Sequence, residues 1–240
     1  MLYAPPIDWD QIQTVLLDMD GTLLDLHFDN YFWQEYLPAC WAEQQGMDLA
    51  QAHAILRPRF RDLEGTLAWY CLDFWTRELE LDLLALKDDI QHKIRLRPHA
   101  DVLLERLRDL GKQCVLVTNA HEAVLDYKLA RTDLGRYFEI LYTAHAFGEP
   151  KESARFWQLL ENHLGFDRRH TLLIDDNQQV LKTAREYGIG HLLGIARPDS
   201  QQPPRSGTEF AVIEDFRDLF GASVVERPAE DEITHPVPEP

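Results

Sequence analysis

Residues 14–22 read Thr14-Val15-Leu16-Leu17-Asp18-Met19-Asp20-Gly21-Thr22, a short apolar run followed by two carboxylates one residue apart. An apolar, β-branched run of this length is typical of a strand buried in a parallel sheet. Side chains alternate along extended backbone, so Asp18 and Asp20 should point to the same side, where like charges repel unless a cation lies between them. Gly21 permits a sharp turn directly afterwards. The pattern predicts a site for a divalent metal and an anionic substrate at the end of this strand.

A calcium-binding loop is the main alternative for the same acidic residues. The EF-hand loop needs glycine at position six and glutamate at position twelve, and a helix precedes it. Counted from Asp18, this sequence has Gly21 at position four and Asp29 at position twelve, and a predicted strand comes first. The calcium loop is therefore disfavoured. A purely structural turn remains an alternative.

Composition limits the classes of partner. The chain has 240 residues, which suggests one or two domains, and a formal net charge of −17. Such acidity repels long polyanions, so we expect no nucleic-acid polymer as a partner. A small phosphorylated molecule can still bind if a metal, one lysine and backbone amides make a pocket locally electropositive.

Cysteine content and the chain termini bear on location. The three cysteines, Cys40, Cys71 and Cys114, have no disulfide or zinc-site spacing, and the ten histidines are dispersed, so we expect a reduced, cytoplasmic protein. The N-terminus lacks the pattern of a signal peptide, and no run of about 18 apolar residues occurs, so no membrane association is expected. Residues 222–240 are rich in Glu and Pro and are expected to form a disordered acidic tail.

Strand and helix patterns alternate along most of the chain. Further apolar runs at 114–118, 140–142, 171–175 and 191–195 predict strands, with helical periodicity between them. This order predicts an α/β fold with a doubly wound parallel sheet. Residues 26–94 break the alternation and carry helix-like aromatic patterns, which predict an inserted all-helical cap domain. Residues 1–25 and 95–221 would then form a Rossmann-like catalytic core.

Groups that act on a ligand in such a sheet lie beyond the carboxyl ends of the strands. There the sequence places Thr118 and Asn119, then Lys151, then the pair Asp175 and Asp176. Each has an ordinary alternative: Thr118 can cap a helix, a lone lysine is usually solvated, and paired acids often precede a helix.

In order and spacing these motifs together resemble those of the haloacid dehalogenase superfamily, and the position of the insertion resembles its helical-cap subgroup. The resemblance implies that Asp18 is the nucleophile and that Asp20 is the general acid/base. It also implies a Mg²⁺ cofactor bound by Asp18, the backbone carbonyl of Asp20, and Asp176 with help from Asp175. The resemblance further implies that Thr118, Asn119 and Lys151 bind the substrate phosphate.

Three further segments, residues 24–33, 69–75 and 147–152, look like the bacterial GMP/IMP 5'-nucleotidase family. That resemblance implies a purine nucleoside monophosphate as substrate. We expect its base to stack on a cap aromatic ring and to be read by an amide or carboxylate such as Asn30 or Asp29, although both residues can instead simply start the first cap helix. A phosphatase or phosphomutase acting on a small sugar or organic-acid phosphate remains an alternative. So does a non-catalytic regulatory binding module, although such proteins are expected to lose Asp18, Asp20 or Lys151. The sequence fixes no oligomeric state.

Overall fold

A computed structural model describes residues 7–220, and the tail predicted at 222–240 lies outside this range. All the strands of its one six-stranded sheet are parallel, in the order β3-β2-β1-β4-β5-β6. They span β1 (Thr14–Leu17), β2 (Gln113–Thr118), β3 (Ile140–Thr143), β4 (Thr171–Ile174), β5 (His191–Ile195) and β6 (Val212–Ile213). The predicted doubly wound parallel sheet is confirmed. The two-residue strand β6 was not predicted, because it is too short to show a periodic pattern.

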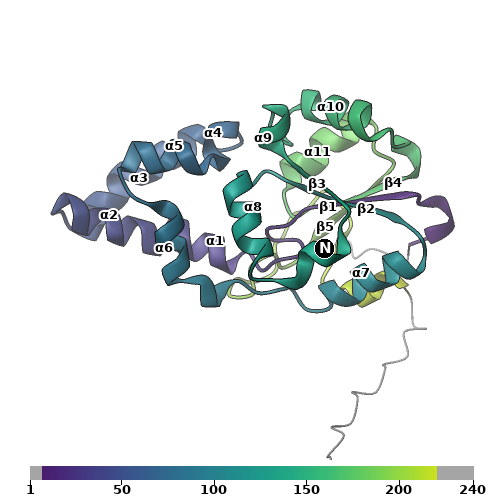
Figure 1. Cartoon of the computed structure of the whole chain (residues 1–240), viewed down its shortest axis with the longest axis horizontal. Helices are drawn as coiled ribbons and strands as arrows, with labels where there is room; N and C mark the ends of the chain where they lie inside the picture. Colours follow the sequence, from purple (N-terminus) through teal and green to yellow (C-terminus); the bar gives the residue numbers. More distant parts are fainter. Residues whose placement is uncertain (1–6, 221–240) are drawn as a thin grey trace, which may run out of the picture.

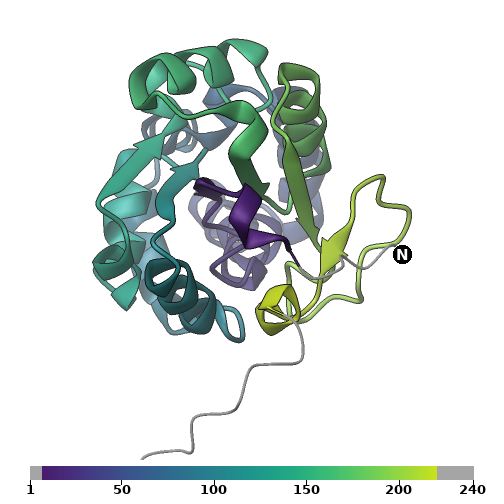
Figure 2. The ribbon, with the colours of Figure 1, turned by 90° about the vertical axis from the view of Figure 1, so that its right-hand side faces the viewer.

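Helices cover both faces of the sheet (Figures 1 and 2). Apolar residues of α7 and η6 pack on one face, and those of α10 and α11 pack on the other. The helical elements of this core are η1 (Trp9–Gln11), α7 (Ala100–Asp109), α8 (Glu122–Leu129), η4 (Asp133–Tyr137), α9 (Ala144–Phe147), α10 (Ala154–Leu164), η5 (Arg168–His170), α11 (Gln178–Tyr187) and η6 (Phe216–Phe220). Strand β1 lies in the middle of this sandwich and is buried along its whole length.

Between residues 26 and 94 all the regular secondary structure is helical, as predicted, and we call this segment the cap. It contains α1 (His27–Tyr31), η2 (Phe32–Tyr36), α2 (Leu37–Gln45), α3 (Leu49–Leu63), α4 (Leu67–Tyr70), α5 (Leu72–Leu79), α6 (Leu83–Asp89) and η3 (Gln91–Lys93). The cap has its own hydrophobic core and extends from one end of the sheet (Figure 1). Leu24 and Leu96 form an isolated antiparallel bridge, so the chain enters and leaves the cap side by side. This supports the domain boundaries, which remain a prediction.

The first cap helix contains a π-helical turn. The backbone stays helical from α1 through η2 into α2, with the wider turn at Phe32–Tyr36. Pro38 follows this turn and has no N–H to donate, which disfavours a regular α-helical hydrogen bond to the preceding turn. The irregular turn carries Trp33, whose side chain lines the pocket described below. Turns of this kind are frequent at functional sites.

Candidate active site

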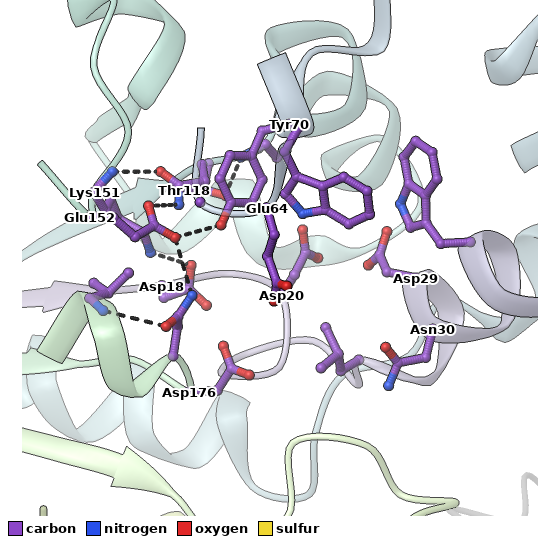
Figure 3. Close-up of a pocket in the computed structure, with 18 of the residues that line it drawn as sticks. Asp18, Asp20, Asp29, Asn30, Glu64, Tyr70, Thr118, Lys151, Glu152 and Asp176 are labelled. Carbon is purple, nitrogen blue, oxygen red and sulfur yellow. Dashed lines mark hydrogen bonds and ion pairs between the residues drawn. The ribbon is translucent and has the colours of Figure 1, made fainter. Parts of the chain in front are cut away.

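Three neighbouring strands bring the predicted site residues together. Leu17, the last residue of β1, pairs with Leu116 of β2 and with Ile174 of β4. Asp18, Thr118 and Asp175 therefore emerge at the same edge of the sheet. With Asp20, Asn119, Lys151 and Asp176 they line a pocket of about 870 Å³ between core and cap (Figure 3). All the site residues predicted from sequence thus lie in one cavity.

Lys151 joins two of the carboxylates. Its Nζ lies 2.6 Å from Asp18 Oδ1 and 2.6 Å from Asp175 Oδ2, and the lysine is only 2% exposed. Its backbone N–H donates to Asn119 Oδ1 at 2.9 Å, which fixes the loop after β3 against the end of β2. Burial by itself would lower the pKa of Lys151, but the negative charges of Asp175 and Asp18 together raise this pKa above its ordinary value. The alternative of an ordinary solvated lysine at position 151 is therefore excluded.

The carboxylates of Asp18, Asp175 and Asp176 form a buried cluster, with oxygen atoms within 4.8 Å of one another. Burial raises the pKa of Asp18 to about 6, although Lys151 opposes the shift. Burial and then the negative charge of Asp18 raise the pKa of Asp176 to about 8. The positively charged side chains of the protein therefore neutralise only part of the negative charge of these three carboxylates. Three carboxylates in a buried group suit a hard divalent cation such as Mg²⁺.

Two neighbours shape the Asp176 side of the cluster. Gly21 has a φ of +84°, and a Cβ placed there would come within 2.7 Å of the Asp176 carboxyl carbon. Arg205 binds the backbone oxygen of Asp176 and lies 3.0 Å from its Oδ2. The glycine is thus needed for both its backbone conformation and its lack of a side chain. Arg205 was not predicted from the sequence.

Asp20 has a different set of partners. Lys128 Nζ lies 2.6 Å from Asp20 Oδ1 and 2.6 Å from Asp29 Oδ2, and Lys87 Nζ lies 3.4 Å from Asp29 Oδ1. Burial raises the pKa of Asp20 to about 6, while Lys128 opposes the shift and Asp29 adds to it. This agrees with the raised pKa that general acid catalysis requires.

The ion pairs of Asp29 change its expected role. Burial alone would raise the pKa of Asp29, but Lys128 and Lys87 hold it below its ordinary value. Both carboxylate oxygens accept from a lysine, so the expectation that Asp29 reads a purine base is disfavoured. Asn30 also lines the pocket, but its Nδ2 donates to Asp199 Oδ2 at 2.7 Å.

Glu152 organises the loop around Lys151 (Figure 3). It accepts hydrogen bonds from Tyr70 Oη at 2.6 Å, Asn119 Nδ2 at 2.9 Å and Asn177 Nδ2 at 3.2 Å. It thereby ties the cap to the ends of β2 and β4. Position 152 directly follows the predicted lysine, and that proximity is the signal by which the residue could have been found.

Thr118 lies at the edge of the pocket and does not cap the following helix. It is 2% exposed and lines the pocket, while its Oγ1 accepts from the backbone N–H of Ala120 at 3.0 Å. The residue that caps α8 is His121, whose side chain accepts from the backbone N–H of Ala123. Thr118 therefore shapes the turn before this helix at the edge of the site.

Aromatic rings and charges line the rest of the pocket. Trp33, Phe60 and Trp69 are half-buried, with ring centroids 5.2–5.6 Å apart, and all three face the cavity from the cap. The complete lining contains seven Asp or Glu residues and four Lys or Arg residues. The protein groups alone thus leave an excess of negative charge, and an anionic ligand needs a further cation here.

Comparisons with known proteins agree with this geometry. The model of the haloacid dehalogenase-like hydrolase family matches residues 12–188. The GMP/IMP nucleotidase YrfG of Escherichia coli is 40% identical over 214 residues, which cover 89% of this chain and 96% of that protein. A phosphoglycolate phosphatase of Neisseria gonorrhoeae is 22% identical, over 82% of this chain and 89% of that protein.

Solved structures show the same fold. The crystal structure of a HAD phosphatase from Thermococcus onnurineus superposes with a TM-score of 0.70 at 20% identity, covering 87% of this chain and 96% of that one. A putative β-phosphoglucomutase from Thermotoga maritima gives a TM-score of 0.60 at 17% identity, covering 87% and 97%. The chain is therefore an enzyme of the haloacid dehalogenase-like hydrolase family, with the parallel core and helical cap described above.

Proposed function

We propose that this protein is a Mg²⁺-dependent phosphomonoesterase that acts through an aspartyl-phosphate, with purine nucleoside 5'-monophosphates such as GMP and IMP as substrates. The observation that carries the proposal is the buried contact of Lys151 with Asp18 at 2.6 Å, next to Asp175 and Asp176. This arrangement places a nucleophilic carboxylate, the ammonium group of Lys151 and carboxylate oxygens that can bind a metal next to one another.

Asp18 is the proposed nucleophile. With a pKa raised to about 6, it is mostly ionised at neutral pH and can attack phosphorus. A covalent intermediate divides one difficult step into two easier ones. Lys151 holds Oδ1 of this carboxylate and places positive charge where the phosphoryl oxygens gather negative charge.

Asp20 is the proposed general acid and base. A pKa of about 6 keeps part of the population protonated near neutrality, so Asp20 can donate to the departing ester oxygen. The resulting carboxylate can then take a proton from the water that hydrolyses the intermediate. Lys128 holds Oδ1, which leaves Oδ2 without an ion-pair partner among the described residues.

Asp18, Asp176 and the backbone carbonyl of Asp20 would hold Mg²⁺, with Asp175 positioned through Lys151 to support them. When bound, the ion offsets the charge of the carboxylates and phosphate and polarises the transferred group. The acidic excess of the pocket and the raised pKa of Asp176 support this assignment.

The nucleotide substrate is inferred from the relative and the cap. YrfG is a GMP/IMP nucleotidase and matches nearly the whole of this chain. A cavity of about 870 Å³ suits a nucleotide, and Trp33, Phe60 and Trp69 offer rings for a base to stack on.

All three cysteines carry free thiols, which supports the expected cytoplasmic location.

Phosphate release from a panel of substrates tests the proposal. GMP, IMP, AMP, phosphoglycolate and glucose 1-phosphate should be assayed with Mg²⁺ and with EDTA, for the wild type and for Asp18→Asn. We expect release that depends on Mg²⁺, highest kcat/KM for GMP and IMP, and almost no release by the variant. Equal kcat/KM for all substrates would overturn the nucleotidase assignment, and near wild-type release by Asp18→Asn would overturn the mechanism. A phosphomutase would instead return glucose 6-phosphate.

A further inference from the structure

A second group of metal-binding side chains lies at the junction of cap and core. One potential ligand atom each from Cys71, His121 and His145 lies within 4.8 Å of the others. Cys71 lies between α4 and α5 of the cap, while His121 begins α8 and His145 belongs to α9 of the core. The three residues lie far apart in the sequence, so the sequence alone did not indicate the group, because zinc sites are recognised in sequences by short spacings between ligands.

The hydrogen bonding of these side chains leaves ligand atoms available. His145 Nε2 is buried and finds no hydrogen-bond partner among the described residues, which is costly unless another group binds it. The imidazole rings of His121 and His145 meet edge to face, with centroids 4.9 Å apart. Nδ1 of His121 accepts from the backbone N–H of Ala123 at 3.3 Å, so a metal bound at Nε2 would require the ring proton to move to Nδ1 and this long hydrogen bond to break.

The Cys71 thiol is placed to act as a thiolate ligand. It caps the N-terminus of α5 and accepts from the backbone N–H of Phe74 at 3.4 Å. A helix N-terminus favours a negatively charged sulfur. Hydrogen bonds of this kind commonly orient metal ligands.

Nearby charges and the donor types favour a transition metal. Asp73 Oδ2 lies 3.8 Å from His121 Nε2, and Glu122 adds a second negative charge near His145. One thiolate and two imidazoles select zinc over magnesium, which prefers the oxygen ligands of the catalytic cluster.

We propose that Cys71, His121 and His145 form a zinc-binding site that ties the cap to the core beside the active site. In a tetrahedral zinc site, ligand atoms lie about 3.3–3.6 Å apart, so the three groups, which lie within 4.8 Å of one another, would have to close by up to about 1–1.5 Å. Water or Asp73 would complete the shell. The site joins the α4–α5 connection to the core next to the bond between Tyr70 and Glu152, and so reinforces the same side of the pocket.

The site is tested by measuring metal binding to the untagged protein. Substrate is left out, and excess Mg²⁺ fills the carboxylate cluster. Co²⁺ serves as the spectroscopic probe, because a cysteine ligand gives an intense thiolate-to-cobalt absorption band. Equilibrium dialysis with Zn²⁺ then gives stoichiometry and affinity. Cys71→Ser keeps a side chain that can cap α5, and His145→Gln removes a ligand from the core. Cys40→Ser is the matched control, since Cys40 lies in α2 outside the cluster.

The expected result is one zinc ion per chain and a cobalt–thiolate band in the wild type and in Cys40→Ser. Both should be lost in Cys71→Ser, and zinc affinity should fall at least about tenfold in His145→Gln. Circular dichroism confirms that the variants are folded. A wild type that binds no more zinc than Cys71→Ser, or a thiolate band that survives that substitution, would overturn the proposal. Neither result depends on the nucleotidase assignment, because no substrate is present.

Discussion

Lys128 and Asp20 form an ion pair, with Nζ 2.6 Å from Oδ1, the lysine only 1% exposed and the aspartate side chain 21% exposed. The same ammonium lies 2.6 Å from Asp29 Oδ2, so it links the proposed general acid to the first cap helix. Burial opposes the charge, but the two carboxylates raise the pKa of Lys128. The lysine therefore positions Asp20 and tunes its titration, without a contact to Asp18 or Lys151 among the described interactions.

Replacement of Lys128 tests this positioning role. In Lys128→Met the two carboxylates lose their shared cation, so the pKa of Asp20 should rise. General acid–base catalysis contributes about 10²–10⁴-fold, and we expect kcat to fall by about 10- to 100-fold. The alkaline limb of the kcat/KM profile, where Asp20 loses its proton, should move to higher pH. Steady-state kinetics over a pH series measures both effects.

The control for this experiment is Lys182→Met, which removes an exposed lysine from α11. It should leave the pH profile unchanged. A Lys128→Met enzyme that is folded, by its circular dichroism, but keeps the wild-type alkaline limb would show that the ion pair is only structural.

Gly21 should be intolerant of a side chain for two separable reasons. A left-handed conformation costs a residue with a Cβ about 1–2 kcal/mol, and at this position the added Cβ also collides with the Asp176 carboxylate. Gly21→Ala should therefore lose stability and weaken Mg²⁺-dependent activity at least tenfold. Gly46→Ala is the matched control, since Gly46 has a φ of +65° with nothing within 4 Å. It should lose stability alone. Equal kcat and Mg²⁺ dependence in the two variants would contradict the steric argument.

The carboxylate cluster predicts how stability depends on pH. The pKa of Asp176 is raised from 3.8 to about 8 in the folded protein, so ionisation destabilises the fold. The protonated form of Asp176 makes its full contribution to stability below about pH 4, and this contribution is lost as the pH rises through 8. In EDTA, the Asp176→Asn variant should therefore gain stability relative to wild type as pH increases from 5 to 8.

Mg²⁺ should reverse this difference, because the ion binds the ionised carboxylates and its binding releases protons. Calorimetry at pH 5 and pH 8, with Mg²⁺ and with EDTA, measures the four midpoints for each protein. A stabilisation by Mg²⁺ that is no larger at pH 8 than at pH 5, or that persists in Asp176→Asn, would contradict the assignment of Asp176 as a ligand.

Trp69 provides a test of base stacking. Stacking of a base on an aromatic ring is worth about 1–3 kcal/mol, so Trp69→Leu should raise KM for GMP by about 5- to 150-fold. The KM for phosphoglycolate, which has no base, serves as an internal control and should change little. Parallel changes in both KM values would indicate damage to the cap core, where Trp69 also packs against Trp33.

The sequence predicted the site residues that depend on topology alone. Asp18, Thr118 and Asp175 follow strands that a parallel sheet places side by side, so chain position was sufficient. Lys128 and Arg205 were missed because only tertiary packing brings them to the site. The available signal for Lys128 was its place four residues after Val124, on the buried stripe of α8. The ion pairs of Asp29 were not predicted, because its partners Lys87 and Lys128 lie far away in the chain.

Detection of a phosphoryl group on Asp18 tests the central claim most directly. Asp20 is proposed to serve both the formation and the hydrolysis of the intermediate, so the wild type during turnover is the protein in which the intermediate should be trapped. Rapid acid quench after mixing with GMP and Mg²⁺, followed by peptide mass spectrometry, should find one phosphoryl group on Asp18. The same treatment of Asp18→Asn should find none. Hydrolysis of GMP by the wild type with no phosphoryl group on Asp18 in the quenched samples would contradict the account.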